Sequence, residues 1–263
     1  MEIIMNHKKL FQFALDLGEL MLSSGAETFR VEDTMFRILS KSNYQYVEAF
    51  VTPTGIFTTM SSSTENSELP LSYIRRVSMR TNNMNKIVEA NQISRLFCSD
   101  QISLEEAVQA LETLKHQKEY PDWQIILATT VTASAFTLMF GGNLYDAMAA
   151  VIAGFCLALA NYFLDKTKTS KFFQLLLGGF IVGFISIFLN RFLHIGDNMD
   201  LIIIGGIMPL VPGVAITTGI RDIINGDLVS GVSRAADAFI IAALIATGVG
   251  FALKLYHLAG GLL

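Results

Sequence analysis

The feature that most constrains the fold is a series of five apolar stretches in the second half of the chain. They are Trp123–Phe140, Leu144–Leu164, Phe172–Phe192, Leu201–Ile220 and Ala238–Leu258. A hydrocarbon core of about 30 Å needs roughly 20 apolar residues in helical form, because every backbone amide must be paired inside the segment. A buried helix of a soluble protein explains any one stretch but not five in succession. The sequence therefore predicts five transmembrane helices, and the Gly179/Gly183 GxxxG pattern predicts close helix packing.

Charged residues are concentrated outside these stretches. Residues 1–122 carry 28 of the 42 Lys, Arg, Asp and Glu side chains of the 263-residue chain. This change in composition predicts a soluble α+β domain over residues 1–120 and an all-α membrane domain over residues 121–263. Because 52% of the residues are hydrophobic and only two are cysteines, the chain is neither disordered nor a disulfide scaffold.

Positive charges in the short connections predict the orientation. Five Lys or Arg residues occupy the second and fourth connections, against two in the third connection and the C-terminal tail. They are Lys166, Lys168, Lys171, Arg221 and Arg234, against Arg191 and Lys254. Cytoplasmic loops carry the excess of Lys and Arg, and residues 1–10 hold no apolar stretch long enough for a secretory signal. We therefore expect the N-terminal domain in the cytoplasm and the C-terminus outside.

Residues 1–120 change periodicity along their length. The pattern predicts helices over residues 8–24, 28–41, 85–97 and 104–118, and strands over residues 44–52, 55–60 and 71–77 around the polar loop 61–70. Gly25 suits a helix C-cap. Ser103 and Glu106 form a capping-box pattern at the start of the last helix.

A polar cluster near the start of the chain has two interpretations. It consists of Ser24, Glu27, Arg30, Glu32 and Asp33. Helix electrostatics explain it, because carboxylates favour the positive end of a helix dipole and Arg30 is a helical neighbour of Glu27 and Asp33. A ligand-binding role is the alternative.

The sequence carries no signature of enzyme chemistry. It contains no nucleophile elbow, P-loop or dinucleotide fingerprint, and its four histidines are isolated from one another. We therefore expect no enzyme activity, no cofactor, no metal and no nucleic-acid partner.

The most informative stretch for function is Gly205-Gly206-Ile207-Met208-Pro209-Leu210-Val211-Pro212-Gly213, inside the fourth apolar stretch. Each proline lacks an amide hydrogen, so if the segment were helical the carbonyls of Gly205 and Met208, four residues earlier, would lose their partners. Such carbonyls are tolerated in a bilayer only if they face protein, water or a solute. Transporters use discontinuous helices of this kind to bind substrates and ions. A plain proline kink repaired by neighbouring helices is the alternative.

Other polar residues near the membrane ends complete a candidate solute site. Gly213 is predicted to begin the second half-helix. Asn143 and Asp146 open the second span, where capping explains them as well as function does. The candidate substrate-binding residues are Gly205, Met208, Pro209, Pro212, Gly213, Thr217, Thr218, Asn143, Asp146, Asp222, Asp227, Arg234 and Asp237.

Four motifs spread over nearly the whole chain occur together in a known family. They are Leu22-Ser23-Ser24-Gly25-Ala26-Glu27-Thr28-Phe29-Arg30-Val31-Glu32, then Gly141-Gly142-Asn143 leading to Asp146, then Met208-Pro209-Leu210-Val211-Pro212-Gly213, then Arg221-Asp222 with Gly226-Asp227 and Arg234. In this combination the chain resembles the bacterial threonine/serine exporter family. The resemblance implies a cytoplasmic N-terminal domain and a multi-pass domain in the bacterial plasma membrane that exports small hydroxy amino acids such as threonine and serine.

A split branch of that family implies partners. It is associated with succinate export and pairs a chain of this size with a smaller membrane subunit, whereas fused members continue into a second set of spans. We expect such a subunit, a second copy of the chain, or both. Succinate export with this partner is the alternative function, and a membrane-anchored ligand sensor is a further one. For export, we expect the solute carboxylate to meet the amides after Gly213, and an acid among Asp146, Asp222 and Asp237 to couple export to a proton.

Overall fold

The computed structural model describes residues 2–42, 44–61, 70–78, 81–117, 120–167 and 169–260. Lys168 and most of the predicted loop 61–70 lie outside these ranges. The chain forms two compact units. Unit 1 contains Met1–Lys118 and Gly213–Asp237, and unit 2 contains Glu119–Pro212 and Ala238–Leu263.

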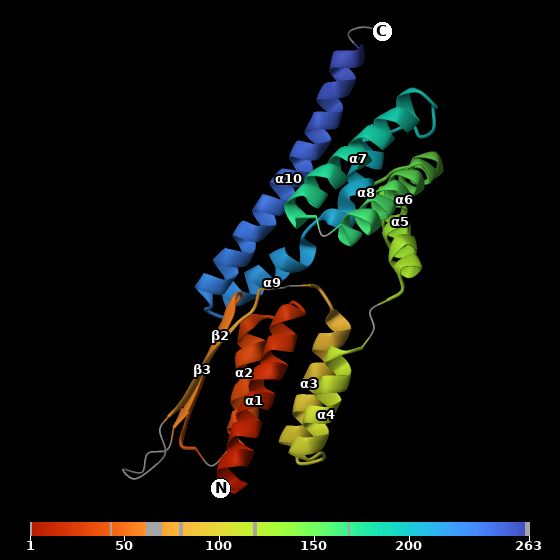
Figure 1. Cartoon of the computed structure of the whole chain (residues 1–263). Helices are drawn as coiled ribbons and strands as arrows, with labels where there is room; N and C mark the ends of the chain where they lie inside the picture. The colour runs from red at the N-terminus through yellow and green to blue at the C-terminus, as the bar shows by residue number, and fades with distance from the viewer. Residues whose placement is uncertain are drawn as a thin grey trace. The chain divides into compact units, whose positions relative to one another are not determined.

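The N-terminal part of unit 1 combines helices with a three-stranded antiparallel sheet of order β1-β2-β3 (Figure 1). The helices are α1 (Glu2–Ser23), α2 (Thr28–Leu39), α3 (Met84–Cys98) and α4 (Leu104–Lys115), and the strands are β1 (Tyr46–Thr52), β2 (Gly55–Ser61) and β3 (Leu71–Arg76). The helices and strands predicted for this region are therefore present, with ends that differ by a few residues. The predicted capping box of Ser103 and Glu106 is confirmed at the start of α4.

A tight turn connects α1 to α2. Gly25 adopts φ = 97°, a left-handed conformation that costs glycine little. The amide of Ala26 donates to the carbonyl of Met21, and the amide of Gly25 donates to that of Leu22, each at 3.1 Å. This is the Schellman arrangement, which confirms the predicted glycine C-cap.

The buried face of the sheet belongs to the same core as α1 and α2. Val51 and Ile56, paired across β1 and β2, are fully buried. Leu17 of α1 and Met35 of α2 lie in the same apolar cluster. Burying an apolar side chain of this size contributes about 1.5–3 kcal/mol. This core therefore fixes the N-terminus of α2, which matters for the site described below.

The second segment of unit 1 is a helical hairpin made of α9 (Gly213–Ile224) and the first turns of α10 (Leu228–Gly260). Two glycines bring these helices together. A Cβ on Gly231 would lie 2.7 Å from the carbonyl oxygen of Gly219 and would also collide with the side chain of Ile223. Close packing of this kind tolerates no added methyl group without a shift of one helix.

Over its described residues, the secondary-structure elements of unit 2 are all helices (Figure 1). It contains α5 (Asp122–Met139), α6 (Leu144–Lys166), α7 (Lys171–Arg191), α8 (Met199–Ile207), the 3₁₀ turn η1 (Met208–Leu210) and the remainder of α10. A Cβ on Gly179 would lie 2.5 Å from the carbonyl oxygen of Ile245, and one on Gly183 would lie 3.0 Å from Cβ of Ala252. The GxxxG pattern of α7 therefore packs against α10, as predicted.

The number of membrane-crossing helices differs from the prediction. Within the described ranges, three helices are long and apolar enough to cross a membrane, namely α6, α7 and α10, and α8 with η1 and α9 adds a fourth if this bent pair forms one span. The helix α5 is not among them, because Asp122, Gln124 and four threonines dilute its apolar content. The fifth predicted span is part of a longer helix, since α10 begins at Leu228. The five-span prediction is not confirmed.

The two units are defined by which residues pack together. The predicted domains are instead defined by a change in composition that indicates water on one side and lipid on the other. Residues 213–237 lie in the predicted membrane domain but pack in unit 1. Because packing does not locate the bilayer, the division into domains over 1–120 and 121–263 stays a prediction.

We expect Gly205→Ala to destabilise unit 2. Gly205 lies in α8, where a Cβ would be 2.7 Å from the amide nitrogen of Thr137 and 2.8 Å from the carbonyl oxygen of Ala133 in α5. Overpacking of this kind lowers the free energy of unfolding by about 1–3 kcal/mol. The unfolding temperature in detergent measures this loss of stability. A thiol-reactive dye reports unfolding on heating, because Cys156 is a free, half-buried thiol of unit 2. Cys98→Ser serves as the background.

Gly250→Ala in α10 is the matched control, since a Cβ there would meet nothing within 4 Å. It should leave the unfolding temperature unchanged or slightly higher. An unchanged temperature for Gly205→Ala would contradict the close contact between α8 and α5.

Candidate functional site

The predicted interruption of the fourth apolar stretch is present. The helix α8 ends at Ile207, η1 covers the next three residues, Val211 is extended, and α9 begins at Gly213. Pro209 and Pro212 supply no amide hydrogen, so an unbroken α-helical ladder of hydrogen bonds cannot cross them. The predicted start of the second half-helix at Gly213 is confirmed.

The hydrogen bonds at the break differ from those of a continuous α-helix. The carbonyl of Gly205 accepts a bond from the amide of Met208, and the carbonyl of Met208 accepts one from the amide of Val211 at 3.1 Å. Both bonds connect residues three positions apart, as in a 3₁₀ helix. These two carbonyls, which a continuous helix would leave unpaired, therefore have backbone partners, because the shorter spacing supplies amides in place of those that the prolines lack.

A cavity of about 600 Å³ lies beside the break in unit 2. Its lining residues are Tyr120, Gln124, Ile125, Ala128, Thr129, Thr132 and Pro209. Their polar groups are a phenol, an amide and two hydroxyls, and none of the seven is an Asp, Glu, Lys, Arg or His residue. A cavity of this size with a few polar groups is suited to a small polar molecule held by hydrogen bonds.

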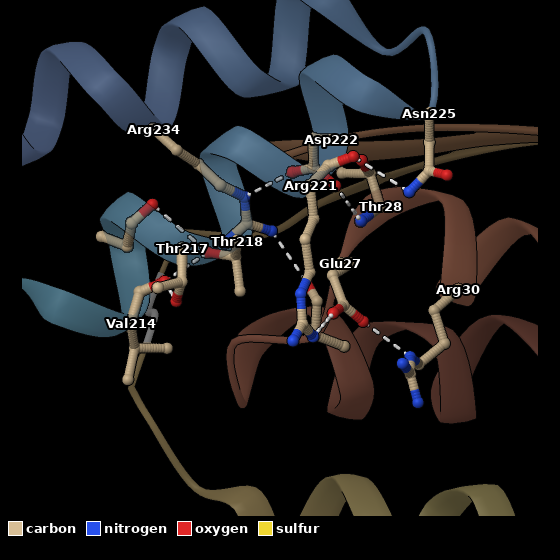
Figure 2. Close-up of polar contacts among 12 residues, drawn as sticks. Glu27, Thr28, Arg30, Val214, Thr217, Thr218, Arg221, Asp222, Asn225 and Arg234 are labelled. Carbon is tan, nitrogen blue, oxygen red and sulfur yellow. Dashed lines mark hydrogen bonds and ion pairs between the residues drawn. The ribbon is translucent and has the colours of Figure 1, made fainter.

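The threonines of α9 bond within their own helix (Figure 2). Thr217 Oγ1 donates to the carbonyl of Gly213 at 3.1 Å, and Thr218 Oγ1 donates to the carbonyl of Val214 at 2.7 Å. A Cβ on Gly213 would meet nothing within 4 Å. The start of α9 is therefore open, and its polar groups are mainly the backbone amides of its first turn.

Asp146 anchors the connection between α7 and α8 to the N-terminus of α6. Its carboxylate accepts hydrogen bonds from the amides of Asn143, Asp197 and Asn198, at 2.6–3.0 Å. It also accepts one from the side chain of Asn198 at 3.1 Å. Asn143 and Asp146 form a capping box, and Asp146 is fully buried. The predicted N-cap is confirmed, and both carboxylate oxygens of Asp146 have partners within the protein.

A second group of polar residues gathers in unit 1, where the N-terminus of α2 meets α9 (Figure 2). Asp222 Oδ1 accepts a hydrogen bond from the amide of Thr28 at 3.2 Å, and Asp227 accepts one from the Thr28 hydroxyl at 2.6 Å. Thr28 is the first residue of α2, so Asp222 lies at the positive end of that helix. The Glu27 side chain at the N-cap position makes no capping hydrogen bond. The carboxylate that accepts from the first amide of α2 is that of Asp222 in α9.

Arg234 adds a contact from α10. Its Nη2 donates to the carbonyl of Ala26 at 2.7 Å, and its Nε lies 2.9 Å from Asp222 Oδ2 (Figure 2). The Arg234 side chain is 8% exposed and that of Asp222 is 0% exposed. The contact is an ion pair without hydrogen-bond geometry, since neither Arg234 Nε nor Asp222 Oδ2 has a hydrogen-bond partner in the part of the chain that the structure describes. Each of these two buried charges is therefore balanced mainly by the charge of the other, and removing one would leave the other unpaired.

The pKa values of two glutamates of this group are shifted in opposite directions from the ordinary value. Burial raises the pKa of Glu27, but hydrogen bonds and charge from Arg221 and Arg30 outweigh burial and hold it below its ordinary value. Those arginines lie 2.7 and 2.6 Å from its carboxylate oxygens. Burial and nearby carboxylates raise the pKa of Glu32 despite the bond that it accepts from the amide of Val51 at 2.7 Å.

The sequence indicated the polar residues near Glu27 and those near Asp222 as candidates, but it did not predict that these two segments contact each other. The expected pairing of Glu27 with Arg30 is confirmed. Thr28 and Arg221 were not among the predicted site residues, yet each bonds across 194 positions. Acids beside arginines occur in both segments, and that pattern does not specify which acid pairs with which base. Asp237 lies half-buried in α10. Over the described ranges, no group of three or more His, Cys, Asp or Glu side chains is arranged to hold a metal ion.

We expect Glu27→Gln to destabilise unit 1 in a pH-dependent way. Because the pKa of Glu27 is lowered in the folded protein, its ionised form stabilises the fold above the unfolded pKa of about 4.3. This contribution is lost as the pH falls through the lower, folded value. At neutral pH the loss should be about 1 kcal/mol, since both arginines are partly exposed.

The reaction of Cys98 with a thiol-reactive dye on heating, in a Cys156→Ser background, measures this effect. Glu112→Gln, at an exposed pair with Lys115, is the control and should leave the unfolding temperature unchanged. A difference between Glu27→Gln and the parent that persists unchanged into acid would contradict the assignment.

Comparison with known proteins places this arrangement in a family. Residues 12–256 match the family ThrE, described as "Putative threonine/serine exporter". The "Probable threonine/serine exporter" of Mycobacterium tuberculosis is 22% identical over 248 residues, covering 94% of this chain and 46% of the relative. The "Threonine/serine exporter" of Corynebacterium glutamicum is 24% identical over 255 residues, covering 94% of this chain and 51% of the relative.

A third relative has a similar length. The "Probable succinate transporter subunit YjjP" of Klebsiella aerogenes is 20% identical over 240 residues, which cover 91% of each chain. This chain spans about half the length of the first two relatives. No solved structure matches it. Because the family match extends over most of the chain, this protein belongs to the ThrE family of threonine/serine exporters, which are multi-pass membrane transport proteins and not enzymes.

Proposed function

We propose that this protein exports small hydroxy amino acids such as threonine and serine across a bacterial plasma membrane, and that the cavity beside the break receives the solute. The family and the apolar helices support transport. The observation that carries the proposal is that Pro209, part of the break, lines a cavity with a phenol, an amide and two hydroxyls. Discontinuous helices recur at the solute sites of membrane transporters.

The lining of the cavity favours a solute without net charge. Succinate carries two negative charges, and the cavity offers no cationic side chain to balance them. A hydroxy amino acid is a zwitterion with no net charge, and its polar groups match the hydroxyls of Thr129 and Thr132. This argument supports threonine and serine over succinate.

Succinate export remains the alternative function. The relative from Klebsiella aerogenes is named a succinate transporter subunit, and that word supports an assembly with another membrane chain. We propose a smaller membrane subunit or a second copy of this chain as the partner.

The proposed orientation has two supports. The excess of Lys and Arg in the second and fourth connections favours a cytoplasmic N-terminal domain and an external C-terminus. The bonds from Thr28 to Asp222 and Asp227 hold the fourth connection against the N-terminal residues within unit 1, which requires one side of the membrane for both.

Solute contact with the other predicted residues stays a prediction, as does coupling to a proton through Asp146, Asp222 or Asp237. Asp146 and Asp222 are fully buried and bonded to groups of the protein itself. The proposal therefore relies on the cavity and not on these acids.

Efflux of labelled threonine, serine and succinate from cells that produce the full chain tests the proposed function. Pro209→Ala combined with Pro212→Ala restores two backbone amides and should reduce threonine efflux about tenfold or more, because the break loses its shape. Pro53→Ala, in the turn between β1 and β2, is the control and should transport normally. Full efflux by the doubly substituted protein, at equal amounts in the membrane, would remove the break from the transport route.

A second experiment addresses the cavity directly. Thr129→Val and Thr132→Val keep the side-chain size and remove one hydroxyl each, so the KM for threonine should rise about fivefold per substitution, the equivalent of one hydrogen bond. Thr247→Val is the control, because that hydroxyl is exposed on α10 and donates to the carbonyl of Ala243. Unchanged KM values for both cavity variants would place the solute elsewhere.

A further inference from the structure

The hairpin of α9 and α10 is held at the N-terminus of α2 by contacts between residues far apart in the sequence. From the hairpin, Asp222 accepts the bond from the Thr28 amide, and Arg234 donates to the carbonyl of Ala26 (Figure 2). These contacts join residues 194 and 208 positions apart. Both partners on the α2 side are backbone groups. Two further bonds of the hairpin involve side chains of that segment, from the Thr28 hydroxyl to Asp227 and from Arg221 to Glu27.

The two hairpin residues are bound to each other as well. Arg234 and Asp222 are almost completely buried and lie 2.9 Å apart. Removing one member of such a pair leaves an unpaired buried charge, whereas removing both is often neutral. The glycine crossing between Gly219 and Gly231 brings the helices close enough for this pair to form.

What holds α9 also sets where the broken helix resumes. The first residue of α9, Gly213, follows directly on Pro212, the last residue of the break. A Cβ on Gly213 would meet nothing within 4 Å, so the start of α9 has no close packing contact on that side. The helix α9 is held further along, where Gly219 crosses Gly231 and where Asp222, two residues before the C-terminal residue Ile224, meets the start of α2.

We propose that Asp222 and Arg234 are positioning residues for export, through which the N-terminal domain holds α9 and with it the second half of the break. This gives the N-terminal domain a task in transport that the cavity alone does not require. The inference rests on the proposed function for its kinetic test, and on the fold alone for its structural test.

Neutral substitutions that keep the hydrogen bonds test the pair. The Asp222→Asn side chain keeps an oxygen that can accept from the Thr28 amide, and the Arg234→Gln side chain keeps an N–H that can donate to the Ala26 carbonyl. Each single variant should lower the maximal export rate about tenfold, with KM for threonine within about twofold of the parent. The double variant should recover to within about threefold of the parent rate, because no charge is left unpaired.

Hydrogen exchange of the full chain in detergent supplies a readout that does not need transport. Amides of residues 213–224 should exchange about tenfold faster in either single variant and return toward the parent rate in the double variant, while α6 and α7 stay unchanged. Asp33→Asn is the matched control, since it removes the same charge from an exposed pair with Arg37 in α2. It should alter neither export nor exchange.

The outcomes separate the possible roles. A raised KM with an unchanged maximal rate in Asp222→Asn would make Asp222 a solute-binding residue and overturn the proposal. A double variant slower than either single variant, or unchanged exchange in α9, would overturn it too. If the parent protein exports neither threonine, serine nor succinate, the proposed function fails, and the exchange experiment alone decides whether Asp222 and Arg234 position α9.

Discussion

A proline supplies no amide hydrogen to its helix, and the architecture around the cavity depends on how the chain pairs its carbonyls at Pro209 and Pro212. The chain tightens into η1, so that Gly205 and Met208 accept from amides three residues ahead. The carbonyls of Gly205 and Met208 therefore have hydrogen-bond partners within the break itself. Pro209 can line a cavity without leaving these two carbonyls unpaired.

Two buried carboxylates, Asp146 in unit 2 and Asp222 in unit 1, accept hydrogen bonds from backbone amides of other segments. Asp146 accepts from the amides of Asp197 and Asn198 as well as from its own capping box, and Asp222 accepts from the amide at the start of α2. In each case an acid from one segment satisfies the backbone of a segment distant in the sequence. Asp146 has several hydrogen-bond donors around it, whereas Asp222 has the Thr28 amide and the charge of Arg234. Acidic residues in a transporter sequence can therefore serve the fold as well as the solute.

The N-terminal residues and the break are connected through α9. The apolar core shared by α1, α2 and the sheet fixes the end of α2, and that end binds Asp222. The helix α9 in turn begins where the break ends. This order of dependence explains why motifs at residues 22–32 and 221–234 belong to one exporter fold, although neither set lines the cavity beside Pro209.

The sequence by itself determined the features that depend on local chemistry. Pro209 and Pro212 interrupt a helix wherever they occur, Gly25 ends α1, and Asn143 with Asp146 caps α6, because each effect acts over a few residues. Only the tertiary structure decided the pairings of Asp222 with Thr28 and Arg234. Long-range partners depend on how helices pack, and acids and arginines are too frequent in the sequence to specify them.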